Sequence, residues 1–128
     1  MVIDSSALVA ILFDEPERRT LVDKIAADPV RLLSAVSLVE LSVVVESRAG
    51  DAGGRDLDLF LHRAGVEIVA FTPEQAAIAR AAFRRFGRGR HRAALNFGDC
   101  CAYALAIHAG EPLLFKGDDF AATDVAAC

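Results

Sequence analysis

This chain begins with Met1-Val2-Ile3-Asp4-Ser5-Ser6 and carries Pro112-Leu113-Leu114-Phe115 near its end, and these two stretches decide the predicted fold. Asp4 ends the first apolar run, and Asp118 and Asp119 follow the second. Short apolar runs that alternate with helical segments are typical of buried strands in a parallel sheet. The sequence therefore predicts an α/β fold whose strands lead into carboxylates.

Between these two stretches, further predicted strands alternate with predicted helices. Strands are expected at residues 30–34 and 66–70, and a short last strand near 124–126. The expected helices span residues 5–12, 17–27, 37–48, 56–63, 73–86 and 97–109. This alternation is the pattern of an α/β protein.

Local signals predict where the helices of the middle region begin and end. Ser37-Leu38-Val39-Glu40 matches a capping box, so a helix is expected to begin at Ser37. Gly50-Asp51-Ala52-Gly53-Gly54 predicts a break before the next helix. Asn96 is the expected cap of the helix that contains Asp99, and Asp99, three residues later, can close a second capping box with it.

Length and composition favour one domain, residues 1–128. The chain has 128 residues, of which 54% are hydrophobic, so it can bury a core. It contains no run of about 18 apolar residues, and its first residues lack the features of a signal peptide, so we expect a cytoplasmic protein without a membrane span. Its cysteines, Cys100, Cys101 and Cys128, predict neither a disulfide framework nor a zinc site.

The net charge of −4 disfavours nucleic acid as a partner, but the basic residues are unevenly distributed. Residues 75–98 contain no acid and carry a basic strip, made of Arg80, Arg84, Arg85, Arg88, Arg90 and Arg92. Such a strip attracts a polyanion even when the whole protein is acidic, and it is equally compatible with a solvated helix face. The phenylalanines are expected in the core, which leaves little for base stacking.

The acids follow strands or begin helices. Asp4, Glu40 and either Asp118 or Asp119 are expected at one edge of the sheet, whereas the helix begun by Asp99 could start at either edge. Carboxylates gathered at a sheet edge suit Mg²⁺ or Mn²⁺. Taken singly, each acid is also explained as a helix cap or a turn residue. Taken together they would repel one another unless a cation were bound.

With these residues in place, the whole chain resembles the PIN-domain family, and in particular the VapC toxins of bacterial toxin–antitoxin pairs. The resemblance rests on four short motifs in order: residues 1–8, residues 37–40, Asn96-Phe97-Gly98-Asp99 and residues 113–120. It implies a PIN-like three-layer sandwich, with a central parallel sheet of four to five strands and helices on both faces. It also implies Mg²⁺-dependent ribonuclease activity on structured RNA such as tRNA or rRNA, a homodimer, and a VapB-type antitoxin that blocks the site.

The resemblance also implies roles for individual residues. Asp4, Glu40 and Asp99 match the acids of the family, and Asp119, favoured over Asp118 by alignment on Phe120, completes the metal ligands. The predicted ion is Mg²⁺, with Mn²⁺ as an alternative. From its position alone, Ser6 is explained first as a helix-start hydroxyl, and alternatively as a residue that orients Asp4 or binds a water on the metal. The predicted RNA contacts are Arg88, Arg90, Arg92 and Lys116.

Three rival interpretations differ from this one. A receiver domain would need an acid at the end of the third strand, where the chain has Val69-Ala70-Phe71. A phosphatase of the haloacid dehalogenase kind would need an acid two residues after Asp4, where Ser6 stands. A PIN-like module that binds RNA or a partner without cutting stays open.

Overall fold

Four short strands form a parallel sheet in the computed structural model, which describes residues 1–128. The strands are β1 (Val2–Ile3), β2 (Leu32–Ser34), β3 (Glu67–Val69) and β4 (Leu113–Leu114), in the spatial order β3-β2-β1-β4. Each strand predicted before residue 120 is therefore present: β1 has the expected length, and the other three are shorter than expected. The order reverses between β1 and β4, and such a switch point is where open α/β sheets bind ligands.

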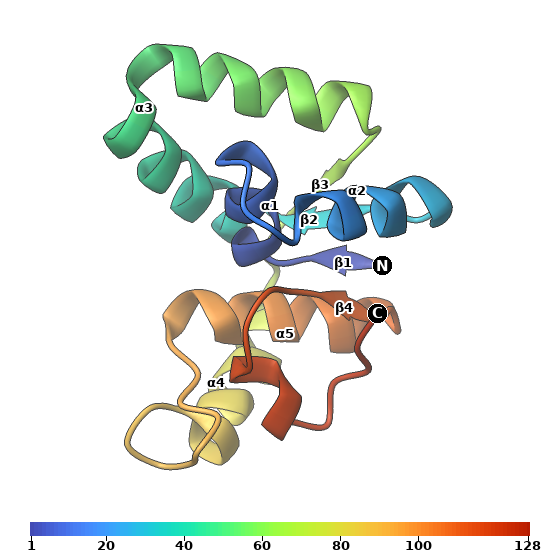
Figure 1. Cartoon of the computed structure of the whole chain (residues 1–128). Helices are drawn as coiled ribbons and strands as arrows, with labels where there is room; N and C mark the ends of the chain where they lie inside the picture. The colour runs from blue at the N-terminus through green and yellow to red at the C-terminus, as the bar shows by residue number, and fades with distance from the viewer.

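Helices cover both faces of this sheet (Figure 1). On one face lie α1 (Ser5–Leu12), α2 (Arg18–Ala27) and α3 (Ala35–Arg63); on the other lie α4 (Pro73–Phe86) and α5 (Phe97–Ala109). The 3₁₀ helix η1 (Asp119–Ala122) follows β4. The predicted three-layer α/β sandwich is confirmed. None of the helices combines the length and the apolar character needed to cross a membrane.

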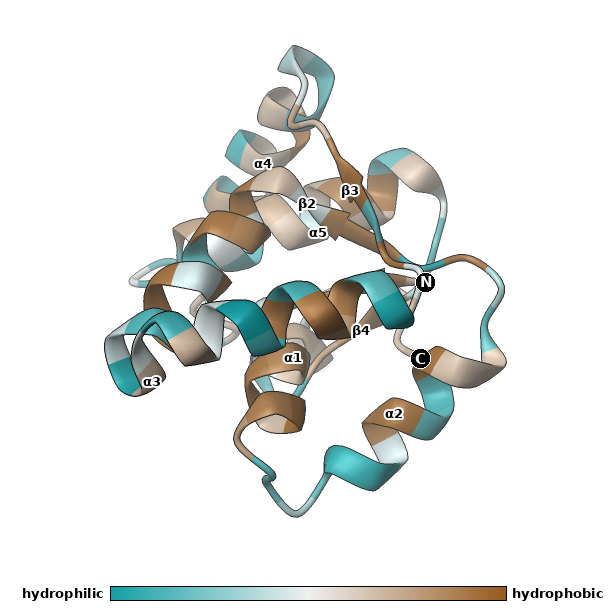
Figure 2. Ribbon diagram, turned by 90° about the horizontal axis from the view of Figure 1, so that it is seen from above, coloured by the Kyte–Doolittle hydropathy of each residue, from teal (hydrophilic) through white to brown (hydrophobic).

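Two buried clusters, one on each face, explain why the strands are apolar without alternation. Ile3 and Leu114 pack with α1, α2 and α3, whereas their neighbours Val2 and Leu113 pack with α4 and α5. Successive strand residues point to opposite faces, so a sheet covered on both faces needs apolar residues at every position. Figure 2 shows α1 brown along most of its length, whereas α2 and α3 alternate between apolar and polar turns, as half-buried helices do.

The predicted start of α3 at Ser37 was wrong. The helix begins at Ala35, and its N-cap is Ser34, whose hydroxyl accepts a hydrogen bond from the backbone N–H of Val36. Ser37 is buried and its Oγ has no hydrogen-bond partner. The capping box does not form because Glu40 instead accepts a hydrogen bond from Ser5, a residue far away in the sequence.

The predicted break at residues 50–54 is a kink at one residue. Gly50 has φ 63° and ψ −156°, and the helix resumes at Asp51 and continues to Arg63. Gly53 stays helical, and a Cβ added there would lie 2.9 Å from Val45 Cγ1, so the two halves of α3 approach closely at this point. Packing of Leu57 and Leu61 into the core stabilises the second half of α3.

The predicted last strand is reduced to a single bridge between Leu113 and Ala127. Its backbone hydrogen bonds run from Leu113 N–H to Ala126 O (2.8 Å) and from Cys128 N–H to Leu113 O (3.1 Å). The other two cysteines, Cys100 and Cys101, are buried in α5, as expected for small core residues.

Candidate active site

Asp4 lies at the switch point between β1 and β4 and is 2% exposed. It caps α1, because its Oδ2 accepts hydrogen bonds from the backbone N–H of Ser6 (2.9 Å) and from Ser6 Oγ (2.6 Å). Ser6 Oγ in turn accepts from the backbone N–H of Lys116 (3.0 Å), which joins the ends of the two strands. Ser6 therefore orients Asp4, and Asp4 Oδ1 is left buried without a hydrogen-bond partner.

Glu40 reaches this edge from α3. Ser5 Oγ donates a hydrogen bond to Glu40 Oε1 at 2.6 Å, so adjacent serines hold the carboxylates of Asp4 and Glu40. The other side of the Glu40 carboxylate lies against Gly98 of α5. Contacts from α1 and α5 thus fix Glu40, instead of the capping box that the sequence predicted.

Asp99 lies in the first turn of α5, which begins at this same edge of the sheet. Figure 1 shows α5 starting at the end where β1 and β4 finish. Asp99 and Asn96 form the predicted capping box: Asn96 Oδ1 accepts from the backbone N–H of Asp99 (2.8 Å), and Asp99 Oδ2 accepts from that of Asn96 (3.0 Å). Asp99 therefore caps α5 and lies at the acidic edge of the sheet at the same time.

Burial and neighbouring carboxylates raise the pKa of two acids at this edge, Asp99 and Asp4. The pKa of Asp99 rises from its usual 3.8 to about 6, first because of burial and then because of the charges of Asp4, Asp119 and Glu40. Burial also raises the pKa of Asp4, and the charge of Glu40 adds to this effect. Asp119, whose charge acts on Asp99, is exposed at the start of η1. The site therefore concentrates negative charge that a cation would neutralise.

The carboxylate oxygens at this edge are ligands that suit a hard divalent cation, although their side chains do not surround a common point. No three His, Cys, Asp or Glu side chains are grouped to hold a metal in their present positions. The unpartnered Oδ1 of Asp4 and the repulsion that raises the pKa of Asp99 are both features that an oxygen-bound cation would relieve. On these observations the residues fit Mg²⁺ or Mn²⁺.

The predicted RNA contacts occupy different environments. Arg88, Arg90 and Arg92 are exposed in the loop that leads into α5, and the guanidinium of Arg90 lies 5.3 Å from the ring centre of Phe83. In the basic strip only Arg85 forms an ion pair, with Asp124 at 3.0 Å. Lys116 differs, because its ammonium group pairs with Glu15 and, at 3.3 Å, with Glu17 of the α1–α2 turn.

An apolar ridge beside the acids was missed by the sequence analysis. It consists of Val39 and Val43 on α3 and Phe97 on α5, which are 64%, 61% and 76% exposed. Phe97 lines two hollows, of about 520 Å³ towards α4 and about 600 Å³ towards α3. The expectation that the phenylalanines are in the core was thus wrong for Phe97 and also for Phe83, which is 40% exposed. The spacing of Val39 and Val43, four residues apart on one helix face, was the available signal.

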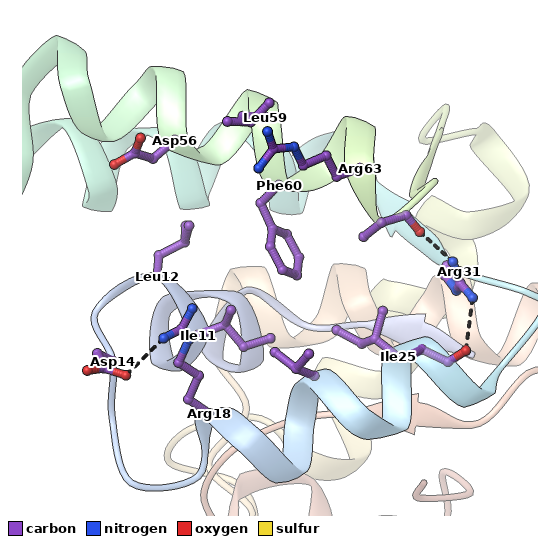
Figure 3. A pocket seen from close by; sticks show the side chains of 13 residues that line it. Ile11, Leu12, Asp14, Arg18, Ile25, Arg31, Asp56, Leu59, Phe60 and Arg63 are labelled. Atoms are coloured by element: carbon purple, nitrogen blue, oxygen red, sulfur yellow. Dashed lines mark hydrogen bonds and ion pairs between the residues drawn. The ribbon is translucent and has the colours of Figure 1, made fainter.

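A third hollow, the α1–α3 groove, lies at the far end of α1 from Asp4 (Figure 3). Its volume is about 610 Å³, and Phe60 points into it from α3 towards Ile25 of α2. Arg31 is held at one end by the backbone oxygens of Ala64 and Ala26. The groove combines an apolar floor with charged residues at its ends.

Comparison with known proteins identifies the family. Residues 1–126 match the PIN domain. The chain is 60% identical over 127 residues to a protein named ribonuclease VapC from Mycolicibacterium smegmatis, covering 99% of this chain and 98% of that protein. It is 56% identical over 126 residues to ribonuclease VapC30 of Mycobacterium tuberculosis, covering 98% and 96%.

Solved structures share the fold at low sequence identity. The VapC20 toxin of Mycobacterium tuberculosis, described as cleaving the sarcin–ricin loop, superposes with a TM-score of 0.80 at 18% identity, covering 99% of this chain and 97% of that one. VapBC2 from Rickettsia felis, bound to a promoter DNA fragment, superposes with a TM-score of 0.78 at 16% identity, covering 98% and 94%. Family match, sequence identity and fold agree: this chain belongs to the PIN-domain family and, within it, to the VapC ribonucleases.

Proposed function

We propose that this chain is the Mg²⁺-dependent endoribonuclease toxin of a VapBC-type pair, a single domain over residues 1–128 that acts in the cytoplasm on structured RNA such as tRNA or rRNA. Two observations carry the proposal: Asp4 Oδ1 is buried without a partner, and the charges of Asp4 and Glu40 help to raise the pKa of Asp99 at the same sheet edge. Relatives named ribonuclease support the same activity.

Asp4, Glu40 and Asp99 would hold the cation, with Asp119 at the exposed side of the site. When bound, Mg²⁺, or Mn²⁺ in its place, supplies positive charge that stabilises the phosphate in the transition state and makes a water molecule more nucleophilic. Ser6 keeps Asp4 Oδ2 engaged, which leaves Oδ1 for the ion. The N-terminus of α5 adds a favourable dipole for an anionic phosphate.

The experiment that tests this function is RNA cleavage by the purified chain with and without Mg²⁺, alongside Asp4→Ala. We expect cleavage of tRNA or rRNA that requires Mg²⁺ and falls at least about 10³-fold in the variant, because a buried ligand is lost. A chain that binds the ion and RNA but cuts none of these RNAs would instead be the non-catalytic PIN-like module.

Arg88, Arg90 and Arg92 are proposed to hold the RNA backbone. Changing all three to Gln is expected to weaken RNA binding and to flatten its salt dependence, because each lost phosphate contact removes about 0.7–0.9 from the slope of log K against log salt. The measurement is a salt titration of binding by the inactive Asp4→Ala chain. The matched control changes Arg19, Arg48 and Arg55, which are exposed on α2 and α3, and an equal loss of slope there would assign the effect to net charge alone.

Lys116 is the fourth proposed RNA contact. Its ammonium group already has two carboxylate partners, Glu15 and Glu17, on the α1–α2 turn. A phosphate must therefore compete with these acids for Lys116. The contribution of Lys116 to RNA binding is expected to be smaller than that of the unpaired arginines.

The partner proposed for the α1–α3 groove is a helix of the VapB-type antitoxin, with apolar residues facing Leu12, Leu59 and Phe60. The charged residues at its ends, among them Arg18 and Arg63, suit a segment of mixed polarity. Helix α1 has eight residues and spans about 12 Å, so an extended segment of about four residues beyond the groove could reach Asp4. Such a partner could cover the groove and block the site together.

The apolar ridge is proposed to be the contact between two copies of this chain. Phe97 stands between two hollows, so a two-fold arrangement can place the ring of one copy in a hollow of the other. Phe97→Glu is expected to convert a dimer into a monomer. The measurement is the molecular mass from size-exclusion chromatography with multi-angle light scattering. Ile107→Glu, on a residue 44% exposed near the other end of α5, should leave the mass unchanged. A dimer that persists in Phe97→Glu would place the contact elsewhere.

A further inference from the structure

Gly98 lies in the first turn of α5, and its backbone does not explain why it is glycine. Five glycines of the chain have positive φ, and Gly98 is not among them. Glycine inside a helix is disfavoured relative to alanine because it loses more conformational freedom. Gly98 is also buried, so alanine would be expected there unless something occupies the space of a side chain.

The occupant of that space is the carboxylate of Glu40. A Cβ added to Gly98 would overlap Glu40 Oε2 and would lie 2.6 Å from Glu40 Cδ and 2.8 Å from Oε1. All three nearest atoms belong to the same carboxyl group, whose Oε1 is also held by Ser5 Oγ. A methyl group at this position could therefore be accommodated only if the carboxylate moved away from α5.

We propose that Gly98 is a positioning residue, which sets the place of the Glu40 carboxylate by leaving room for it against the first turn of α5. Asp99 is the next residue along that turn, so the absence of a side chain at Gly98 lets carboxylates from α3 and α5 approach the same cation. Ser5 holds Glu40 Oε1 by a hydrogen bond, and the absence of a side chain at Gly98 leaves space for the carboxylate. This inference rests on the proposed role of Glu40 as a metal ligand.

The test compares Gly98→Ala with Gly54→Ala, both made in the full chain. Gly54 is a matched control, because it is also helical and a Cβ there would lie 3.1 Å from a glutamate oxygen, that of the exposed Glu46. The probe is Mn²⁺, with its affinity measured by calorimetry. We expect Gly98→Ala to weaken Mn²⁺ binding at least tenfold and Gly54→Ala to leave it unchanged.

Repeating the Gly98→Ala change in a Glu40→Ala chain separates an effect on the position of Glu40 from a general effect on folding. In Glu40→Ala the space beside Gly98 is empty, so adding Gly98→Ala should not change Mn²⁺ affinity further, and it should raise the melting temperature because alanine favours the helix. An affinity of Gly98→Ala within twofold of the unaltered chain, or an equal loss in both backgrounds, would overturn the proposal.

A crystal structure of Gly98→Ala distinguishes this inference from the proposed function. A displaced Glu40 carboxylate supports positioning, and an unmoved one overturns it. If Glu40→Ala alone binds Mn²⁺ and cuts RNA as well as the unaltered chain does, it is the assignment of Glu40 to the metal site that fails.

Discussion

Asp99→Asn is expected to abolish RNA cleavage and, at the same time, to stabilise the metal-free protein. The activity should fall at least about 10³-fold, because the change removes a ligand charge from the proposed metal site while keeping the shape of the side chain. The helix cap should survive, since an asparagine oxygen can still accept the hydrogen bond that Asn96 N–H donates to Asp99.

The gain in stability follows from the raised pKa of Asp99. The pKa of Asp99 is about 6 in the folded chain and 3.8 ordinarily. Folding therefore favours the protonated carboxyl group, and keeping the carboxylate ionised in the folded chain costs free energy. The penalty is absent below about pH 3.8, grows between 3.8 and about 6, and is complete above 6. At about 1.4 kcal/mol for each pH unit it is at most about 3 kcal/mol, and solvent screening reduces it to about 1–2 kcal/mol.

The measurement is thermal unfolding in a chelating buffer at pH 4 and pH 7. The variant should melt about 5 °C above the unaltered chain at pH 7 and near it at pH 4. Asp118→Asn, which changes an exposed neighbouring acid, serves as the control and should shift the melting temperature little. Addition of Mg²⁺ should raise the melting temperature of the unaltered chain more than that of Asp99→Asn. A less stable Asp99→Asn at pH 7 would show that the acids do not repel one another as described.

Leu59→Glu is expected to release the toxin from its antitoxin without changing cleavage. Leu59 lines the α1–α3 groove and is 45% exposed, so the fold should tolerate the change. A carboxylate buried beneath an apolar partner helix is costly, and a loss of about 3 kcal/mol corresponds to an affinity about 100-fold weaker. The readouts are the affinity for the proposed VapB-type antitoxin and the inhibition of RNA cleavage by that protein.

Ile107→Glu is the matched control for this experiment, because Ile107 is equally apolar, 44% exposed and on the opposite face of the sheet. It should bind the antitoxin as the unaltered chain does. If Leu59→Glu is inhibited as strongly as Ile107→Glu, the α1–α3 groove is not the antitoxin site.

Sequence patterns anticipated the elements whose signals are local. The apolar runs at Val2-Ile3 and Leu113-Leu114 became adjacent strands, and the Asn96 to Asp99 capping box formed as predicted. Predictions failed where a distant contact overrides a local pattern. Glu40 accepts a hydrogen bond from Ser5, thirty-five residues away in the chain, instead of capping its own helix. No local pattern distinguishes these two uses of a glutamate.

The sequence by itself determined the α/β fold, the acids Asp4, Glu40 and Asp99 as candidates and the uneven distribution of arginines, because strand hydrophobicity, helix caps and charge are properties of neighbouring residues. Only the tertiary structure decided that α5 begins at the edge where β1 and β4 end, that Gly98 makes room for Glu40, and that Phe97 is exposed while Lys116 is paired. These features depend on which helix faces reach the sheet edge and how closely they pack. Such packing is fixed by contacts between residues far apart in the chain.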